Sequence, residues 1–129
     1  MEKRSVAAMA EEIMTAASME GLRVRHAVGK EQTGSQMVVL DVVEFPPGSV
    51  HVLHRHPNCE QLTYALEGSS LHLSTEGKTR VEQGEAVFVS QGEWHGIEND
   101  TDRPAIVLII YGGVGNLEEA GYEELDQNE

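Results

Sequence analysis

Residues 48–68 read GSVHVLHRHPNCEQLTYALEG, and this stretch combines a strand pattern with a cluster of metal-binding side chains. Two β-like runs, near 50–56 and 61–67, flank the turn-forming sequence PNC. His54 and His56 stand two residues apart, and on a strand residues i and i+2 face the same side. Two neutral imidazoles on one face form half of a site for a divalent transition metal. The stretch therefore predicts a β protein with a candidate metal site.

The same sequence pattern of short strands and turns continues over most of the chain. The further β-like runs are separated by Gly, Pro, Asn and Asp, which break strands and form turns. They lie near 22–28, 36–45, 70–75, 78–82, 86–90, 95–98 and 105–111. Short strands with turns this close together predict an all-β fold, either an antiparallel sandwich or a barrel.

The length of 129 residues suits one domain, which we expect over residues 21–115, with an extension at each end. Apolar residues recur at helical spacing between residues 5 and 19 and predict a short helix in an N-terminal extension, 1–20. The segment 116–129 is strongly acidic, and we expect a solvated C-terminal tail there.

The composition excludes several classes of partner. A formal net charge of −13 repels nucleic acid and anionic membranes, so we expect neither as a partner. The longest apolar run, AIVLII at 105–110, is far shorter than the roughly 20 residues of a membrane span. Glu11 and Glu12 interrupt the apolar stretch near the N-terminus, which argues against a secretion signal and favours a cytoplasmic location. Cys59 is the single cysteine, so no internal disulfide can form, and we expect a plain turn residue.

Two motifs in the chain resemble those of the cupin family. The first is carried by Gly48, His54, His56, Gln61 and Gly68. It follows the family pattern Gly-x5-His-x-His-x(3 or 4)-Glu-x6-Gly, except that glutamine replaces glutamate. The second, GEAVFVSQGEWHGIEN at 84–99, follows Gly-x5-Pro-x-Gly-x2-His-x3-Asn, with Ser90 in place of proline. The resemblance covers roughly residues 36–111, and it implies a jelly-roll antiparallel β-barrel like that of small single-domain (type 2) cupins.

The resemblance also implies one divalent transition metal (Zn, Ni, Mn, Fe or Cu) inside the barrel. Carried over to this chain, the histidine ligands are His54, His56 and His95.

The fourth ligand is open between Gln61 and Glu60. If Gln61 faces inward, so do Thr63 and Ala65, which are small and leave room for a substrate. If Glu60 faces inward, bulky leucine and tyrosine side chains follow it and largely fill that space. The six-residue gap to Gly68 also favours Gln61, which we predict as the fourth ligand, with Thr63 and Ala65 as substrate-contacting residues.

The other candidate residues carry weaker signals. His51 has the opposite parity to His54, so its side chain should leave the barrel interior. His26 and His72 are predicted to be ordinary strand histidines. Tyr111 stands at the end of the last core strand and is a candidate substrate contact at the pocket mouth.

Three neutral imidazoles and a neutral amide would leave the full 2+ charge on the metal, which would make it a strong Lewis acid. We therefore favour an enzyme of the isomerase, lyase or cyclase type acting on a small oxygen-rich substrate. Cupins that rearrange unsaturated uronic acids resemble this chain at all four ligands but carry an acid on the last core strand. Here that strand, 105–111, has no acid or base. The proton carrier would then be metal-bound water, Tyr111 or a residue that the sequence does not place.

Two alternatives stay open: a quercetin dioxygenase-like cupin that uses a redox metal, and a non-catalytic protein that binds a metabolite or a sugar. The glutamine ligand suits metal oxidation less well than a carboxylate. The resemblance also implies a homodimer, and the apolar runs at 22–28 and 36–45 offer edge surface for pairing.

Overall fold

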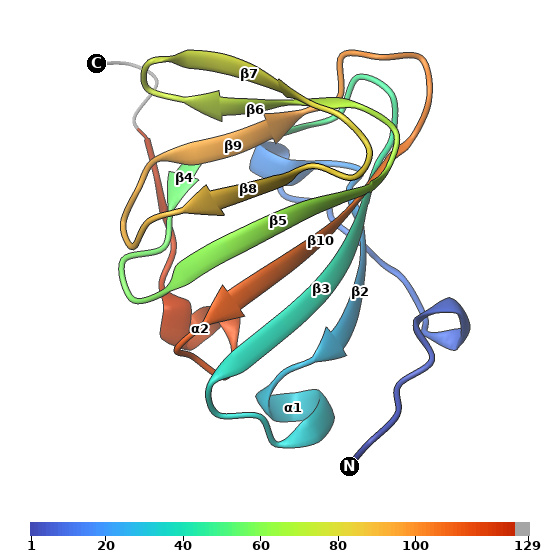
Figure 1. The fold of residues 1–129 in the computed structure, drawn as a ribbon, viewed down its shortest axis with the longest axis vertical. Helices are drawn as coiled ribbons and strands as arrows, with labels where there is room; N and C mark the ends of the chain where they lie inside the picture. The colour runs from blue at the N-terminus through green and yellow to red at the C-terminus, as the bar shows by residue number, and fades with distance from the viewer. Residues whose placement is uncertain (126–129) are drawn as a thin grey trace.

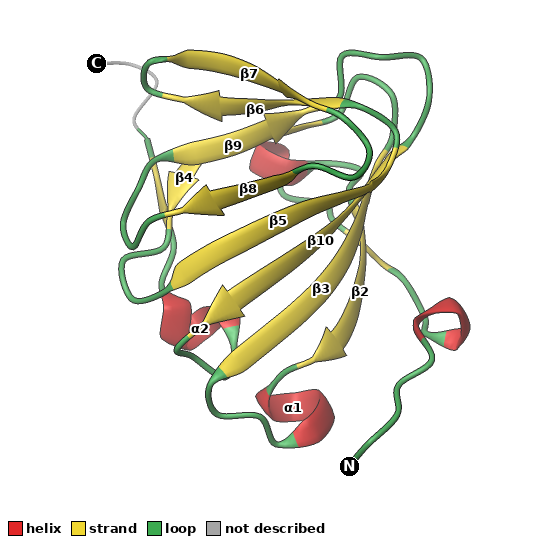
Figure 2. Cartoon of the chain, in the orientation of Figure 1, coloured by secondary structure: helices red, strands yellow, loops and turns green. Residues whose placement is uncertain are grey.

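The computed structural model describes residues 1–125, and it shows two antiparallel β-sheets packed face to face (Figures 1 and 2). The first sheet has the strand order β1 (Glu12–Ile13), β2 (Arg23–Val28), β3 (Val38–Phe45), β10 (Ala105–Gly112), β5 (Glu60–Glu67) and β8 (Ala86–Val89). The second has the order β11 (Glu123–Glu124), β4 (Val50–Arg55), β9 (His95–Glu98), β6 (Ser70–Ser74) and β7 (Gly77–Val81).

The expected all-β fold is confirmed, as a jelly-roll arrangement of these two sheets. The strands predicted from the sequence are all present, and the largest difference is at β3, which begins at Val38 rather than at residue 36. Helical structure is short. It comprises the 3₁₀ helices η1 (Val6–Ala8) and η2 (Ala17–Met19) and the α-helices α1 (Lys30–Thr33) and α2 (Leu117–Ala120). Figure 1 shows α1 and α2 at the same end of the barrel.

The core lies between the sheets and follows the period of two that strands impose. On β10, alternate side chains from Ala105 to Tyr111 are buried, and those between them are partly exposed. On β5 the buried residues are Gln61, Thr63 and Ala65, while the residues between them face solvent. Inward-facing positions of β5 therefore carry polar side chains, and these become available to a site inside the barrel.

Two motif residues have structural roles that their positions explain. Gly68 has a φ of 78°, and a Cβ there would lie 2.6 Å from the carbonyl oxygen of Pro104. Asn99 is fully buried, and its Nδ2 donates hydrogen bonds to the carbonyl oxygens of Phe45 (2.8 Å) and Arg103 (2.7 Å). The glycine permits close approach of two chain segments, and the asparagine satisfies backbone groups that would otherwise be buried without partners.

The prediction of a helix between residues 5 and 19 is wrong. This segment is an extended arm with η1, η2 and the two-residue strand β1, which pairs with β2. A short helix gains little in water without a packed face. The arm instead satisfies its backbone along β2, and Arg23 binds Glu11 in it with N–O distances of 2.8 and 2.6 Å. Pairing with β1 also covers part of the edge that residues 22–28 were expected to offer, at Arg23 and Val24.

The sequence suggested that the acidic C-terminal segment is a solvated tail, but part of it packs against the barrel. Helix α2 buries Ala120 completely, and β11 pairs with β4. Residues 126–129 of the predicted tail lie outside the described residues. Within residues 1–125, no helix is long and apolar enough to cross a bilayer.

Candidate metal centre

Three histidines from two strands and a turn converge inside the barrel. His54 lies on β4, His56 follows that strand, and His95 begins β9, where it pairs with His54 across the ladder. All three are buried, and their potential ligand nitrogens lie within 4.8 Å of one another. Three imidazoles at this spacing could hold a metal ion.

The ring orientation of each histidine is fixed by a backbone carbonyl. Nδ1 of His54 lies 2.7 Å from the oxygen of Val52, and Nδ1 of His95 lies 2.8 Å from the oxygen of Glu93. Nδ1 of His56 lies 2.8 Å from the oxygen of Gly121, in the C-terminal segment. A carbonyl oxygen can only accept, so each Nδ1 carries the hydrogen, and each neutral ring keeps its lone pair on Nε2.

Burial keeps these rings neutral. It lowers the pKa of His54 to about 2 and that of His95 to about 4, and it also lowers the pKa of His56. A metal must compete with protons for imidazole, so neutral rings are ready to bind. Nε2 of His56 is buried and has no hydrogen-bond partner among the described residues. Such an orphaned atom fits a metal ligand, because buried polar atoms normally have a partner.

Of the two candidates for the fourth position, Gln61 is buried and Glu60 is exposed. Oε1 of Gln61 lies 3.1 Å from Nε2 of His95, and Nε2 of Gln61 lies 3.2 Å from Oγ1 of Thr63. Because Nδ1 of His95 holds the ring hydrogen, its Nε2 cannot donate to an amide oxygen. Oε1 of Gln61 and Nε2 of His95 are therefore two acceptors that face each other, an arrangement that suits two ligands of one cation. In the metal-free protein the opposite amide orientation satisfies both atoms, since the NH2 then donates to His95.

The predicted substrate-contacting residues occupy different places around the histidines. Thr63 lies next to Gln61 on the inner face of β5 and is almost fully buried. Ala65 is buried further along the same strand. The ring of Tyr111 meets the ring of His56 edge-on, with centroids 5.1 Å apart. Burial raises the pKa of the Tyr111 phenol, so this side chain stays a neutral hydrogen-bonding group.

The parity argument, which predicted that the His51 side chain leaves the interior, is wrong. The ring of His51 stacks on that of His54 with centroids 3.9 Å apart, rather than leaving the interior. The reason is an irregularity in the pairing of β4 with β9 between His51 and His54, which inverts the alternation. Nothing in the local sequence signals this bulge, because it depends on the partner strand.

The C-terminal segment supplies another aromatic ring that the sequence did not single out. Tyr122 stacks over His54 with centroids 5.2 Å apart, and its hydroxyl lies 3.3 Å from Nε2 of His51. The same hydroxyl donates to Glu124, so it accepts the hydrogen bond from His51. Together with the Gly121 carbonyl on His56, this contact makes the acidic segment one wall of the histidine cluster.

Two cavities flank the cluster. One, of about 140 Å³, lies on the Gln61 side and is lined by Thr63, His72 and His95. His72 is buried, its Nε2 has no partner among the described residues, and burial lowers its pKa to about 4. It is therefore an inward-facing histidine that opens on the same space as two candidate ligands.

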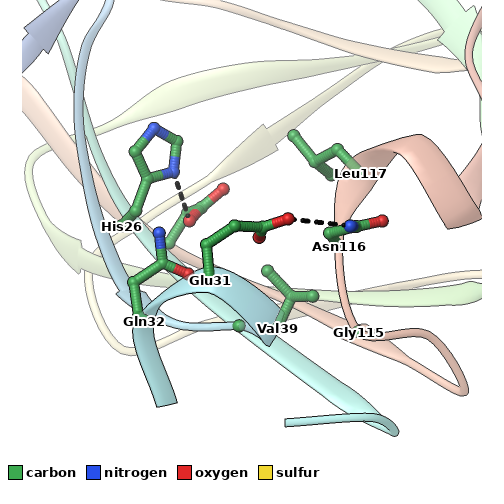
Figure 3. A pocket seen from close by; sticks show the side chains of 9 residues that line it. His26, Glu31, Gln32, Val39, Gly115, Asn116 and Leu117 are labelled. Atoms are coloured by element: carbon green, nitrogen blue, oxygen red, sulfur yellow. Dashed lines mark hydrogen bonds and ion pairs between the residues drawn. The ribbon is translucent and has the colours of Figure 1, made fainter. Parts of the chain in front are cut away.

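The second cavity, which we call the inner cavity, measures about 80 Å³ and lies on the His56 side. Its walls are mostly apolar and include Met14 and Met19 of the N-terminal arm, while its polar lining includes Asp41 and Tyr111. A further hollow of about 230 Å³ opens between α1 and α2 and shares Asp41 and one histidine with the inner cavity. Figure 3 shows this outer hollow, with His26 and Glu31 among the residues that line it.

Asp41 and His26 are functional candidates that the sequence analysis missed. Nδ1 of His26 lies 3.0 Å from Oδ1 of Asp41, and its Nε2 lies 2.8 Å from Oε2 of Glu12. The hydrogen bond with Asp41 is the main cause that raises the pKa of His26 to about 9. The signal available in the sequence was an acid, Asp41, within an otherwise apolar run, VVLDVV.

Comparisons with known proteins agree with this geometry. Residues 41–111 match the model of the cupin domain. The tetracenomycin polyketide synthase protein TcmJ of Streptomyces glaucescens is 28% identical over 127 residues, which is 96% of this chain and 85% of that protein. An oxalate-binding protein of Thermotoga maritima is 28% identical over 91 residues, which is 69% of this chain and 75% of that protein.

A solved structure has the same fold. The polyketide cyclase RemF from Streptomyces resistomycificus superposes with a TM-score of 0.83 at 22% identity, over 98% of this chain and 88% of that one. The cupin match spans more than half of the chain and includes both strands that carry the histidines. The chain therefore belongs to the cupin family.

Proposed function

We propose that the chain is a metal-dependent enzyme that uses one divalent transition metal as a Lewis acid on a small oxygen-rich substrate. The proposed ligands are His54, His56, His95 and Gln61. A cation bound there would polarise a carbonyl or carboxylate oxygen of the substrate.

The observation that carries this proposal is the neutrality of the donor set. Each histidine offers an Nε2 lone pair because its Nδ1 hydrogen is held by a backbone carbonyl. Gln61, the buried side chain of β5 that reaches His95, is an amide rather than a carboxylate. Neutral ligands do not offset the charge of the cation, which favours Lewis-acid chemistry over stabilisation of an oxidised metal.

Among isomerase, lyase and cyclase chemistry, we favour a cyclase type acting on a substrate with several carbonyl groups. The inner cavity is apolar apart from a few polar groups, as suits a carbon-rich substrate with a limited number of oxygens. The arm contributes Met14 and Met19 to its wall, and the match with the polyketide synthase protein TcmJ extends over 96% of the chain. We propose that Thr63, Ala65 and Tyr111 lie along the substrate.

The test begins with metal. Protein stripped with EDTA is titrated with Zn²⁺, Ni²⁺ and Mn²⁺ by calorimetry, and elemental analysis follows purification without added metal. We expect one divalent ion per chain. Changing His56 to Gln should weaken binding at least about tenfold, because it replaces an anchored imidazole by a weaker amide ligand. Changing the exposed Glu60 to Gln is the matched control and should leave affinity unchanged. Equal affinity in both variants would contradict the assigned site.

The match with an oxalate-binding protein favours a second candidate, a non-catalytic protein that binds a small oxygen-rich metabolite. A metabolite that co-purifies and stays unchanged on the metal-loaded protein would support this candidate. The dioxygenase alternative stays a prediction. Oxygen uptake with a candidate substrate, together with tightly bound iron, would support it against the Lewis-acid proposal.

We further propose a homodimer, formed through the outer face of the six-stranded sheet. The large apolar side chains exposed on that face include Leu62, Tyr64, Leu66 and Phe88. Leu62 and Phe88 are direct cross-strand partners, so the exposed side chains form a continuous patch. Size-exclusion chromatography with light scattering should give twice the chain mass, and Phe88→Glu should shift the protein toward monomer. A wild-type monomer at micromolar concentration would contradict the dimer.

A further inference from the structure

We propose, building on the function proposed above, that Asp41 is the catalytic base of this site and that His26 is its positioning residue. Asp41 would accept a proton from the carbon next to a carbonyl group of a substrate held in the inner cavity. The substrate class is therefore an enolisable carbonyl compound with a second oxygen that can bind the same cation.

The position of Asp41 supports this role. It lies on β3 directly opposite Ile109 of β10, and its side chain is 5% exposed. The sequence showed that the last core strand carries no acid, and β3, its neighbour in the sheet, supplies one at the same level of the barrel. Asp41, His56 and Tyr111 line one cavity, so a ligand there can reach both the carboxylate and the histidine cluster.

The pairing with His26 fixes the position of the Asp41 side chain. Both ring nitrogens of His26 face carboxylate oxygens, at 3.0 Å from Asp41 and 2.8 Å from Glu12. The hydrogen bond with Asp41 raises the pKa of His26 to about 9, so the ring is an imidazolium and both of its nitrogens can donate. The bond to Asp41 uses Oδ1, and a carboxylate keeps further acceptor capacity for a ligand.

The three side chains also form a line from the cavity to solvent. Their exposed fractions rise from 5% at Asp41 through 33% at His26 to 60% at Glu12. A structural ion pair between strands would need neither this graded exposure nor a carboxylate in the wall of a cavity. Asp41 and His26 line both the inner cavity and the outer hollow shown in Figure 3, so the pair stands where the two spaces meet.

The proposed step moves one proton and changes no oxidation state. The C–H bond next to the carbonyl breaks, its electron pair forms the new C=C bond, and the former C=O π pair becomes the lone pair of an enolate oxygen. The proton moves to Asp41, whose new O–H bond is formed by a carboxylate lone pair. A divalent cation, when bound, stabilises the negative charge on that oxygen. Return of a solvent-derived proton to carbon regenerates the starting ketone.

The experiment uses α-hydroxyacetophenone, which carries a carbonyl, an adjacent hydroxyl and an apolar ring. Proton NMR in D2O measures the loss of its CH2 signal with zinc-loaded protein. We expect exchange by the wild-type protein and a rate at least about 100-fold lower in Asp41→Asn, as expected for loss of a general base. His26→Gln, which leaves the carboxylate in place, should lower the rate by about tenfold.

Glu11→Gln is the matched control. It weakens another contact between the arm and β2, the Glu11–Arg23 ion pair, at a residue that does not line the inner cavity. Its exchange rate should stay within threefold of wild type. Circular dichroism and zinc content, measured on every variant, separate loss of a base from loss of the fold or of the metal.

A second readout does not depend on turnover. In wild-type protein and in Glu11→Gln, adding the probe should shift the NMR signals of the His26 ring, because the probe sits beside Asp41. Equal exchange by Asp41→Asn and wild type would overturn the inference, and so would zinc-loaded wild-type protein that exchanges nothing or a probe that leaves His26 unshifted. Failure to bind zinc would instead overturn the proposed function.

Discussion

Acidification should strongly destabilise the metal-free protein, because it contains several histidines that fold in the neutral form. Burial lowers the pKa of His54 to about 2 and the pKa values of His51, His72 and His95 to about 4. In the unfolded chain each returns to about 6.5. Below that value the unfolded state binds protons that the folded state does not, so the free energy of unfolding falls as the pH falls.

The magnitude follows from these values. Between about pH 7.5 and about pH 5.5, each neutral buried histidine removes about 1.4 kcal/mol of stability, so the four together remove about 5.5 kcal/mol. His26 acts in the opposite sense. Its pKa is raised to about 9, so its contribution is fully present below pH 6.5 and is lost as the pH rises through 9. Over this interval it returns about 1 kcal/mol, allowing for its partial exposure. The expected net loss is about 4.5 kcal/mol.

Urea unfolding of EDTA-treated protein, followed by the fluorescence of the single tryptophan, measures this loss directly. His72→Asn removes one of the four groups without touching the proposed ligands, and it should reduce the loss by about 1.4 kcal/mol. His26→Gln should increase it by about 1 kcal/mol. Stability that is flat or rises between pH 7.5 and pH 5.5 would refute the reasoning, since it would mean that these histidines are already charged in the folded protein.

Three further changes test the fold and the ligand set. Asn99→Ala should lower the free energy of unfolding by about 3 kcal/mol, because it leaves two backbone carbonyls without their donors, and urea titration would show it. Gly68→Ala should lower it by about 2 kcal/mol, since φ is 78° and the new Cβ would meet the Pro104 carbonyl; a substitution at Gly77, where a Cβ meets nothing within 4 Å, is the comparison. Gln61→Glu should tighten zinc binding at least about tenfold through charge attraction, as measured against a chromogenic chelator, and unchanged affinity would argue against Gln61 as a ligand.

The sequence predicted the strands well because their signals are local. Alternation and turn residues identified β4, β5 and β9, and strand parity correctly indicated that Gln61, and not Glu60, faces inward. The spacing of the two motifs was also sufficient to bring His54, His56 and His95 together. These features need only the period of a strand and the positions of turns.

The errors lie where pairing with a distant segment decided the outcome. The arm between residues 5 and 19 had a helical pattern, but β2 offered it a strand partner. The parity of His51 failed because a bulge depends on β9, and the acidic segment closed on the histidines because Gly121 meets His56. Each outcome is a contact with another segment of the chain, which local propensity does not encode.

The sequence by itself thus determined the all-β fold, the histidine cluster and the absence of an acid on its last core strand, since these follow from residue type and spacing. Only the tertiary structure decided that Asp41 and His26 meet beside the same cavity. They lie on different strands, and their approach depends on the order of β2, β3 and β10 in the sheet, which is set by packing of the whole chain.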